Sequence, residues 1–531
     1  MARTPLFRSL ERALRLARAA DLSGRPAAEI AGEARERRLL TRRQLLQTSA
    51  VAAAGLGLSG CRLARTVPID EPQVLIIGAG IAGLTAGYRL KQRGVSVRIF
   101  EAQERIGGRM FSQRDFFADG QVAELGGELI DTGHTAIRGL ADELGIPLDD
   151  LFTDDPELED EVWFFDDRRI SGAEVVEAYR PVAERIRKDL ASLAEPWATY
   201  DAPNGAQRLD NTTLKQWLEE VGVDGWLRRL LDVGYTTEYG LEIDRQSSLN
   251  LLFLIDPNPD PFRIYGDSDE RFHVRGGNDR IPHALATELE PEIDLGSRLE
   301  AVRLRSDGQF ECTFAKGATS VVRRAPHVVL ALPFTLLRQV DLDLELSPVK
   351  RRAIDELGYG TNAKLMIGFS ERVWRTRHGS NGSVLTELPF QLTWETSRLQ
   401  AGEAGILTNF TGGEHGAFLG QGTAAQQAGI TVDALERIFP GVAAARAGMK
   451  ESRFHWPTHP YTLGSYSCYL PGQWTSIGGA EGERTGRLHF AGEHTSQEAQ
   501  GYMEGGCESG ERVAREILED LGLARPQADV A

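Results

Sequence analysis

The fold is decided by one stretch near the start of the chain, Val74-Leu75-Ile76-Ile77-Gly78-Ala79-Gly80-Ile81-Ala82-Gly83. Its first four residues are apolar and mostly β-branched, which predicts a buried parallel strand. The residues from Leu84 to Arg93 are predicted to form a helix, and those from Val95 to Phe100 a second strand. This order of strand, glycine-rich turn, helix and strand is typical of a unit that binds a dinucleotide.

Three glycines and one acid of this unit have separate predicted tasks. Gly78 permits the tight turn, Gly80 lets the backbone approach a pyrophosphate, and Gly83 lets the helix pack closely on the strand. Glu101 follows the second strand, where a carboxylate accepts hydrogen bonds from ribose hydroxyls. A turn with only a structural role would account for the three glycines but not for the acid. The interpretation that this unit binds a dinucleotide is therefore favoured.

Composition limits the classes of function. The chain has 531 residues, of which 41% are hydrophobic and 26% charged, as in a soluble globular protein of two or three domains. The formal net charge of −17 argues against nucleic acid as the main partner. The cysteines that follow Cys61 are too few and too scattered for a disulfide framework, and no histidines show metal-ligand spacing, so no metal site is expected.

The first 66 residues differ from the rest, with thirteen arginines against five acidic residues. They contain Thr41-Arg42-Arg43-Gln44-Leu45-Leu46 and then an apolar run that is too short to span a bilayer. The run ends in Leu58-Ser59-Gly60-Cys61. The order resembles a bacterial Tat signal with a lipobox, which implies export to the periplasm or cell envelope and a lipid anchor on Cys61. The alternative is a basic amphipathic helix followed by a linker.

Two further motifs specify the dinucleotide. Ile106-Gly107-Gly108-Arg109 and Leu125-Gly126-Gly127-Glu128 follow the nucleotide-binding unit. With them, residues 73–518 resemble the flavin-containing amine oxidase family, which includes monoamine, polyamine and L-amino acid oxidases. The resemblance implies an α/β fold in which a Rossmann-type FAD-binding domain carries an inserted mixed α+β substrate domain.

The domain organisation is predicted from this resemblance and from the positions of prolines and apolar periods. The block from 156 to 255 is expected to be largely helical, and the block from 347 to 454 to mix strands with one helix. The active site is expected where the two domains meet. The predicted segments are 1–66 for the signal, 67–150, 270–345 and 450–525 for the FAD-binding domain, and 151–269 and 346–449 for the substrate domain.

The resemblance also implies which residues hold the cofactor. Trp456 matches a tryptophan that contacts the flavin, and Leu299 lies near the adenine unless it is simply part of the core. A helix that starts near Tyr502 and Met503 would stabilise the reduced flavin by its dipole. The implied FAD contacts are Gly78, Gly80, Gly83, Glu101, Gly108, Arg109, Leu299, Trp456, Glu493, Tyr502 and Met503.

The implied reaction is transfer of a hydride from the α-carbon of an amine to flavin N5. The resulting imine is hydrolysed to an aldehyde or ketone and ammonia, with oxygen as the electron acceptor. By the same resemblance the catalytic residues are Lys364, Tyr466 and Tyr502: the lysine holds a water near N5, and the tyrosines wall the substrate amine. Lys364 would otherwise be an ordinary strand lysine, but its apolar neighbours imply burial, where an unpaired lysine is costly.

The substrate class is less constrained. By the same resemblance, Leu129 sits about where L-amino acid oxidases usually carry an arginine, and Asp131 sits where polyamine oxidases carry an acid. The two carboxylates Glu128 and Asp131 would attract a distal ammonium and repel a carboxylate. Alternatively, one or both pair with Arg138 or cap a helix, and Arg245 or Arg263 restores carboxylate binding. Besides an exported amine oxidase, two hypotheses stay open: an L-amino acid oxidase or dehydrogenase that passes electrons to a membrane quinone, and a flavin-binding scaffold without turnover.

The sequence predicts non-covalent FAD. Ser465 occupies the position where monoamine oxidases carry the cysteine that bonds to the flavin, and a serine cannot form that thioether. Denaturation of the purified protein in acid should therefore release all yellow colour into the supernatant, as absorbance of both fractions will measure. Colour that stays with the precipitated chain would contradict the prediction.

Overall fold

The computed structural model of the protein describes residues 72–524. The twin-arginine segment at 41–46 and Cys61, on which the predicted signal depends, lie outside the described residues. Within the described part, no helix is both long and apolar enough to cross a membrane.

The first layer is a five-stranded parallel sheet, and it confirms the predicted α/β class. Along its buried central strand β1, alternate side chains face opposite sides, as the pleat requires. Val74 and Ile76 pack against helices, whereas Leu75 and Ile77 face a second sheet. The strands in spatial order are β20 (Leu488–Phe490), β13 (His327–Leu330), β1 (Val74–Ile77), β2 (Val97–Phe100) and β9 (Ile293–Asp294).

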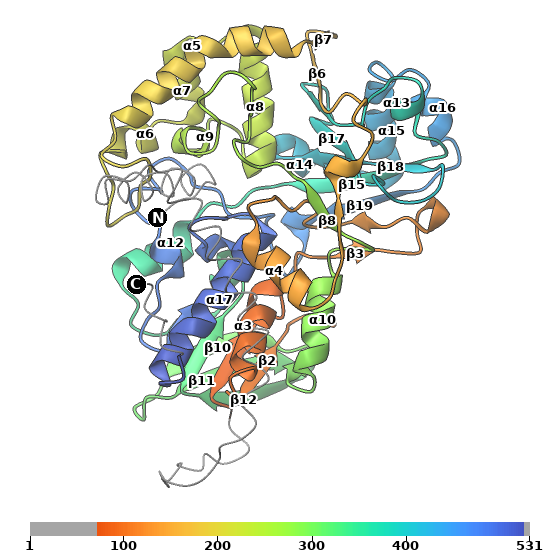
Figure 1. Ribbon diagram of the computed structural model, residues 1–531. Helices are drawn as coiled ribbons and strands as arrows, with labels where there is room; N and C mark the ends of the chain where they lie inside the picture. Colours follow the sequence, from red (N-terminus) through yellow and green to blue (C-terminus); the bar gives the residue numbers. More distant parts are fainter. Residues whose placement is uncertain (1–71, 525–531) are drawn as a thin grey trace, which may run out of the picture. The chain divides into compact units, whose positions relative to one another are not determined.

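Helices cover one face of this sheet and a smaller sheet covers the other. Helix α3 lies beside both α17 and α10, as Figure 1 shows near strand β2. On the opposite face, Phe100 stacks on Phe314 with 4.1 Å between ring centroids. The helices are α3 (Ile81–Lys91), α4 (Thr135–Glu143), α10 (Arg280–Leu289) and α17 (Met503–Asp520), and the smaller sheet is β12 (Thr319–Ala325), β11 (Phe310–Lys316), β10 (Arg298–Leu304) and β14 (Asp341–Asp343).

A seven-stranded sheet forms the other main layer. Its strand β15 is buried at every position, which explains the apolar run predicted around Lys364. Strand β19 pairs with β15, although its residues fall in the range predicted for the FAD-binding domain. The order is β19 (Glu451–His455), β15 (Ala363–Phe369), β18 (Gly405–Thr411), β17 (Leu392–Glu395), β16 (Val384–Thr386), β6 (Val162–Phe165) and β7 (Arg168–Ile170).

The hairpin β6–β7 precedes the helices of residues 156–255 and was not predicted from the sequence. Asp166 and Asp167 turn the chain with φ of 52° and 59°, a conformation that aspartate tolerates in tight hairpins. Strand β6 then pairs in parallel with the distant strand β16. That partner is more than 200 residues away, so local periodicity could not reveal it.

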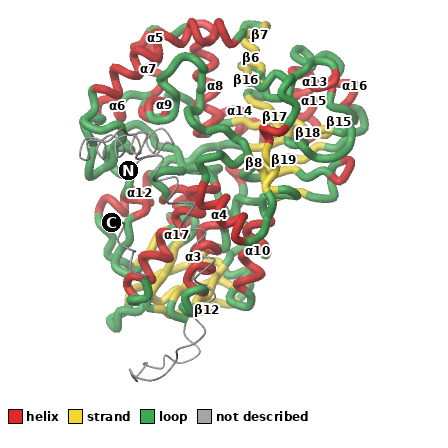
Figure 2. Tube along the Cα trace, in the orientation of Figure 1, coloured by secondary structure: helices red, strands yellow, loops and turns green. Residues whose placement is uncertain are grey.

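Most of the remaining helices, such as α5, α8 and α15, lie in the upper half of Figures 1 and 2, whereas α12 lies lower, next to the C-terminal label; Figure 2 separates helices from strands by colour. Those predicted at 174–193, 214–220 and 226–233 are present, and the last continues to Tyr239. They are α5 (Gly172–Ala191), α6 (Gln207–Asn211), α7 (Leu214–Val221), α8 (Gly225–Tyr239), α9 (Leu249–Leu252), α11 (Phe334–Leu337), α12 (Pro348–Glu356), α13 (Val373–Thr376), α14 (Gly413–Leu419), α15 (Ala424–Leu435) and α16 (Val442–Arg446). Short two-stranded ladders join β3 (Ser112–Gln113) to β4 (Ala123–Glu124) and β5 (Leu148–Asp150) to β8 (Phe272–Val274).

The packing of α3 on β1 predicts the effect of one methyl group. A Cβ on Gly83 would lie 2.0 Å from the carbonyl oxygen of Gly78, so Gly83→Ala must displace the helix. We expect it to lower the Tm by several degrees, since overpacking typically costs about 1–3 kcal/mol. The matched control is Gly139→Ala in α4, where no atom lies within 4 Å of the added Cβ and the Tm should hold or rise. Equal thermal unfolding of both variants would refute the close packing.

Candidate active site

Three glycines line the turn that follows β1. Gly78 has φ of +107°, and a Cβ there would lie 2.4 Å from the carbonyl oxygen of Ala331. Gly80 and Gly108 face each other across the turn, with only 3.3 Å between a Cβ built on Gly108 and the Cα of Gly80. Helix α3 has no acid in its first turn, so its N-terminal amides and dipole are available to an anion. The cradle therefore fits the pyrophosphate of a dinucleotide.

Glu101 is held beside this cradle. Its Oε2 accepts a hydrogen bond from the amide of Ala79 at 2.9 Å, and its Oε1 accepts one from the amide of Gln103 at 2.9 Å. Burial raises the pKa of this carboxyl group, because it takes water away from the carboxylate. Ribose hydroxyls that donate hydrogen bonds to Glu101 would replace that water. Leu299 is buried in β10 opposite Phe314, and its contact with the adenine stays a prediction.

Arg109 and Glu493, predicted separately as cofactor contacts, form one ion pair. Arg109 Nη1 donates to Glu493 Oε1 and to the carbonyl oxygen of Ser465, both at 2.8 Å. Glu493 also accepts from the hydroxyl of Ser467 at 2.8 Å and from the amide of Gly501 at 2.9 Å. Burial opposes ionisation of Glu493, but Arg109, His494 and the Ser467 hydroxyl together outweigh it, and the pKa is lowered. Segments around residues 109, 465 and 493 thus meet at one charged centre.

Trp456 and Met503 flank the loop of residues 125–128. The Nε1 of Trp456 donates to the carbonyl oxygen of Leu125 at 2.9 Å. A Cβ on Gly127 would lie 2.7 Å from the side chain of Met503, so a larger residue there would displace Met503. Asn278, which the sequence analysis did not single out, donates to the carbonyl oxygen of Gly127 at 2.9 Å. These contacts hold the loop's backbone in one position.

Lys364 is paired with Glu128 in the interior. Its Nζ lies 2.6 Å from Glu128 Oε2 and 2.9 Å from the carbonyl oxygen of Gly126, and both side chains are about 5% exposed. The hydroxyl of Thr396 donates to the other carboxylate oxygen at 2.8 Å. Burial would raise the pKa of Glu128, but Lys364 lowers it below the usual value. Lys364 is therefore not an exposed strand lysine.

The expected pairing of Glu128 or Asp131 with Arg138 does not occur. The Cζ of Arg138 instead lies 4.5 Å from the ring centroid of Phe272. Glu128 is paired with Lys364. Asp131 accepts from the backbone amide of Glu270 at 2.8 Å and lies 3.2 Å from a ring nitrogen of His134. Both carboxylates predicted to anchor a substrate ammonium thus have partners within the protein.

Tyr466 and Tyr502, predicted to wall the substrate amine, meet at Glu238. The hydroxyl of Tyr466 donates to the backbone carbonyl of Glu238 at 2.7 Å, and that of Tyr502 donates to its carboxylate at 2.9 Å. Glu238 lies in the last turn of α8, and the sequence analysis missed it. Its only signal was a single acid at the end of an otherwise uncharged stretch from Gly234 to Tyr239.

Glu238 and two further acids, Glu161 and Glu270, have raised pKa values, which favour the neutral form. Burial raises the pKa of Glu238 to about 7, although the Tyr502 hydroxyl opposes the shift, and burial raises that of Glu161 to about 7. Burial also raises the pKa of Glu270 to about 8, and nearby carboxylates, with Asp131 first, add to the shift. No described side chain donates a hydrogen bond to the carboxylate of Glu270. These groups form an acidic lining that a cation would stabilise.

Glu270 has a constrained backbone. Its φ of 45° lies in the left-handed region, which costs a non-glycine residue energy and is common at functional sites. The hydrogen bond from its amide to Asp131 holds this conformation.

The two arginines considered for binding a substrate carboxylate, Arg245 and Arg263, are both exposed. Arg263 also lies 3.7 Å from the carboxylate of Asp267.

Comparison with known proteins gives a family match over residues 81–518 to a model described as flavin containing amine oxidoreductase. A flavin-containing amine oxidase of Oncorhynchus mykiss is 24% identical over 479 residues, which cover 86% of this chain and 87% of that protein. A putative L-amino-acid oxidase of Bacillus subtilis is 25% identical over 462 residues, or 84% and 94% of the two chains. Among solved structures, cyclohexylamine oxidase from Brevibacterium oxydans has a TM-score of 0.74 at 23% identity and covers 85% of this chain and 100% of its own.

The raised pKa values predict a pH dependence of stability. Between about pH 4.5 and pH 8 the folded protein holds protons on Glu238 and Glu270 that the unfolded chain releases. The contribution of these two groups to the free energy of unfolding is therefore lost as the pH rises through 7 and 8. The Tm of the wild type should therefore fall relative to that of Glu270→Gln from pH 5 to pH 8.5. The control Glu157→Gln removes an exposed acid and should give a flat difference. A flat difference for both variants would contradict the shift.

Proposed function

Because the chain belongs to the flavin-containing amine oxidoreductase family, we propose that it oxidises primary amines that carry a second positive charge, with oxygen as acceptor. Family membership establishes FAD as the cofactor and oxidation of an amine or amino acid as the activity. The choice of a dicationic amine depends mainly on one observation, a cluster of acids in which Glu238 contacts both tyrosines and Glu238 and Glu161 both raise the pKa of Glu270.

When bound, FAD supplies the two-electron chemistry, accepting a hydride from the carbon that bears the nitrogen. The chain's own residues orient the substrate. The hydroxyls of Tyr466 and Tyr502 are tied to Glu238, so their rings are held as fixed walls that exclude water from the amine. Lys364 uses two of its three N–H groups on Glu128 and Gly126, which leaves the third to hold a water.

Glu238 and Glu270 have different roles in this proposal. An ammonium must lose a proton before its carbon can give up a hydride, and Glu238, with a pKa of about 7 and a tyrosine on its carboxylate, is suited to take it. Glu270, with no donor on its carboxylate, is suited to bind the second ammonium. Because Glu128 and Asp131 have internal partners, the proposal moves the ammonium contact predicted for them to Glu270.

An L-amino acid substrate is the second candidate, because a relative named as a putative L-amino-acid oxidase and one named as an amine oxidase are similarly identical to this chain, at 25% and 24%. Its carboxylate would have to enter an acidic lining, which repulsion opposes. Electron transfer to a membrane quinone and a scaffold without turnover are weaker candidates. The scaffold would not need Lys364, Trp456, Tyr466 and Tyr502 together.

We further propose that the protein is exported by the Tat machinery and works in the periplasm or cell envelope. The support is the sequence of residues 1–66, with its paired Arg42 and Arg43, its apolar run and Cys61 in order. Tat export carries folded proteins, which suits a chain that loads its cofactor in the cytoplasm.

The substrate class can be tested by anaerobic bleaching of the flavin at 450 nm with diamines, monoamines of equal length and L-amino acids. We expect diamines to bleach it at the lowest concentration. Glu270→Gln should raise the KM for a diamine about 10- to 100-fold and leave that for the monoamine within two-fold. Glu157→Gln, which removes an exposed acid, should change neither.

Each other outcome has a definite meaning. Bleaching by amino acids alone would replace the proposed substrate class with the second candidate, and bleaching by nothing would favour the scaffold. Slow recolouring on admission of air would indicate a dehydrogenase rather than an oxidase. An equal rise in KM for diamine and monoamine would remove Glu270 from the role of ammonium anchor.

A further inference from the structure

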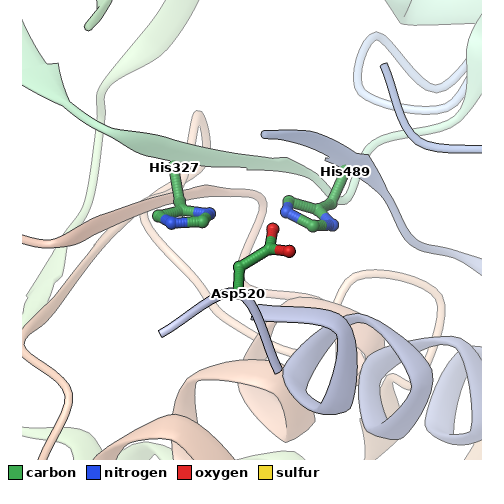
Figure 3. A group of neighbouring side chains, drawn as sticks. All are labelled: His327, His489 and Asp520. Atoms are coloured by element: carbon green, nitrogen blue, oxygen red, sulfur yellow. The ribbon is translucent and has the colours of Figure 1, made fainter. Parts of the chain in front are cut away.

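Three potential metal ligands converge on the parallel sheet, away from the glycine cradle. His327 is the first residue of β13, His489 is the middle residue of β20 and Asp520 is the last residue of α17. One ligand atom from each lies within 4.8 Å of the others. Figure 3 shows the two imidazole rings side by side above the carboxylate. The cradle lies beyond the opposite end of β13, next to Ala331.

Both histidines are buried with an unsatisfied nitrogen. His327 is 2% exposed and His489 0% exposed, and His327 Nδ1 and His489 Nε2 have no hydrogen-bond partner. Their ring centroids are 5.8 Å apart and the angle between the ring planes is 23°, so the two rings are close neighbours that no hydrogen bond joins. Buried polar atoms without partners are rare, because such an atom loses its hydrogen bonds to water and gains none in the protein. The pair is therefore arranged for a group that accepts two nitrogen lone pairs.

The surroundings orient one of these rings. His489 Nδ1 lies 2.8 Å from Glu516 Oε2, and a proton on Nδ1 leaves Nε2 as a lone-pair donor. A carboxylate behind a histidine in this way is the usual support of a metal-binding imidazole. Asp520 is engaged by Arg484 at 2.7 Å through Oδ2 only, which leaves Oδ1 for a metal.

We propose that His327, His489 and Asp520 form a Zn²⁺ site that links two strands of the parallel sheet to the end of α17. Two imidazole nitrogens and one carboxylate oxygen suit zinc, with water as a fourth ligand, whereas Mg²⁺ and Ca²⁺ prefer oxygen ligands throughout. Bonds of about 2.0–2.2 Å require the ligand atoms to close up, which the partly exposed Asp520 at a helix end can do.

The site was not expected from the sequence, because the positions 327, 489 and 520 have no metal-ligand spacing. Only the order of strands in the sheet makes β13 and β20 neighbours. Helix α17 begins at Met503, beside the predicted flavin contacts, and ends at Asp520. A metal there would have a structural role, since it would tie down the far end of the helix that starts at the active site.

The test uses the flavin-loaded enzyme, stripped with a chelator, desalted and then incubated with Zn²⁺ or Mg²⁺. We expect one equivalent of zinc per chain after a second desalting, a rise in Tm with zinc, and neither effect with magnesium. Asp520→Asn should weaken zinc binding at least ten-fold, measured by competition with a chelating dye. Its matched control is Glu519→Gln, which removes the same charge one residue earlier and should bind as the wild type does.

Arg484→Gln provides a test in the opposite direction. It removes the guanidinium that holds Asp520, so it should tighten zinc binding several-fold, an effect that a misfolded variant would not produce. The flavin spectrum of each variant reports whether the fold is intact. Absence of bound zinc in the wild type would overturn the proposal, and so would equal affinity in Asp520→Asn and Glu519→Gln.

Discussion

The candidate active site depends on the buried ion pair between Lys364 and Glu128. Lys364 belongs to the seven-stranded sheet and Glu128 to the loop that follows the cofactor cradle, so the pair joins two parts of the candidate site that are remote in sequence. Such a pair persists in the interior only when its remaining polar atoms are bonded, and here Thr396 and the carbonyl of Gly126 complete it. Loss of either partner would leave an isolated buried charge, at a cost of about 3–5 kcal/mol.

Four acids of the candidate site fall into two groups that electrostatics separates. Glu128 and Glu493 are buried and each has a cationic partner, which lowers the pKa and keeps them ionised. Glu238 and Glu270 have no cationic partner, so desolvation raises the pKa of each. The first group is engaged within the protein, and the proposed function assigns the second to the substrate. This division, rather than the count of acids, supports a cationic amine as the substrate.

Much of the fold could be predicted because its signals are local. The buried strand from Val74 to Ile77, the glycines after it and the helices at 174–193 and 214–220 depend on residues close in the chain. The predicted ends of the helices were less accurate. Helix α3 was predicted to begin at Leu84 but begins at Ile81, because Gly80 is its N-cap and Gly83 already lies in its first turn. The hairpin β6–β7 was missed, because its partner β16 is remote in sequence.

The sequence by itself determined the nucleotide-binding unit, the family and the identity of the residues in its motifs, since each motif carries its own turn, strand or helix signal. Only the tertiary structure decided how those residues are partnered. It paired Lys364 with Glu128, brought Glu238 to both tyrosines and set His327 beside His489. The physical reason is that these contacts join residues more than 100 positions apart, and their meeting depends on strand order and helix packing, which no local pattern encodes.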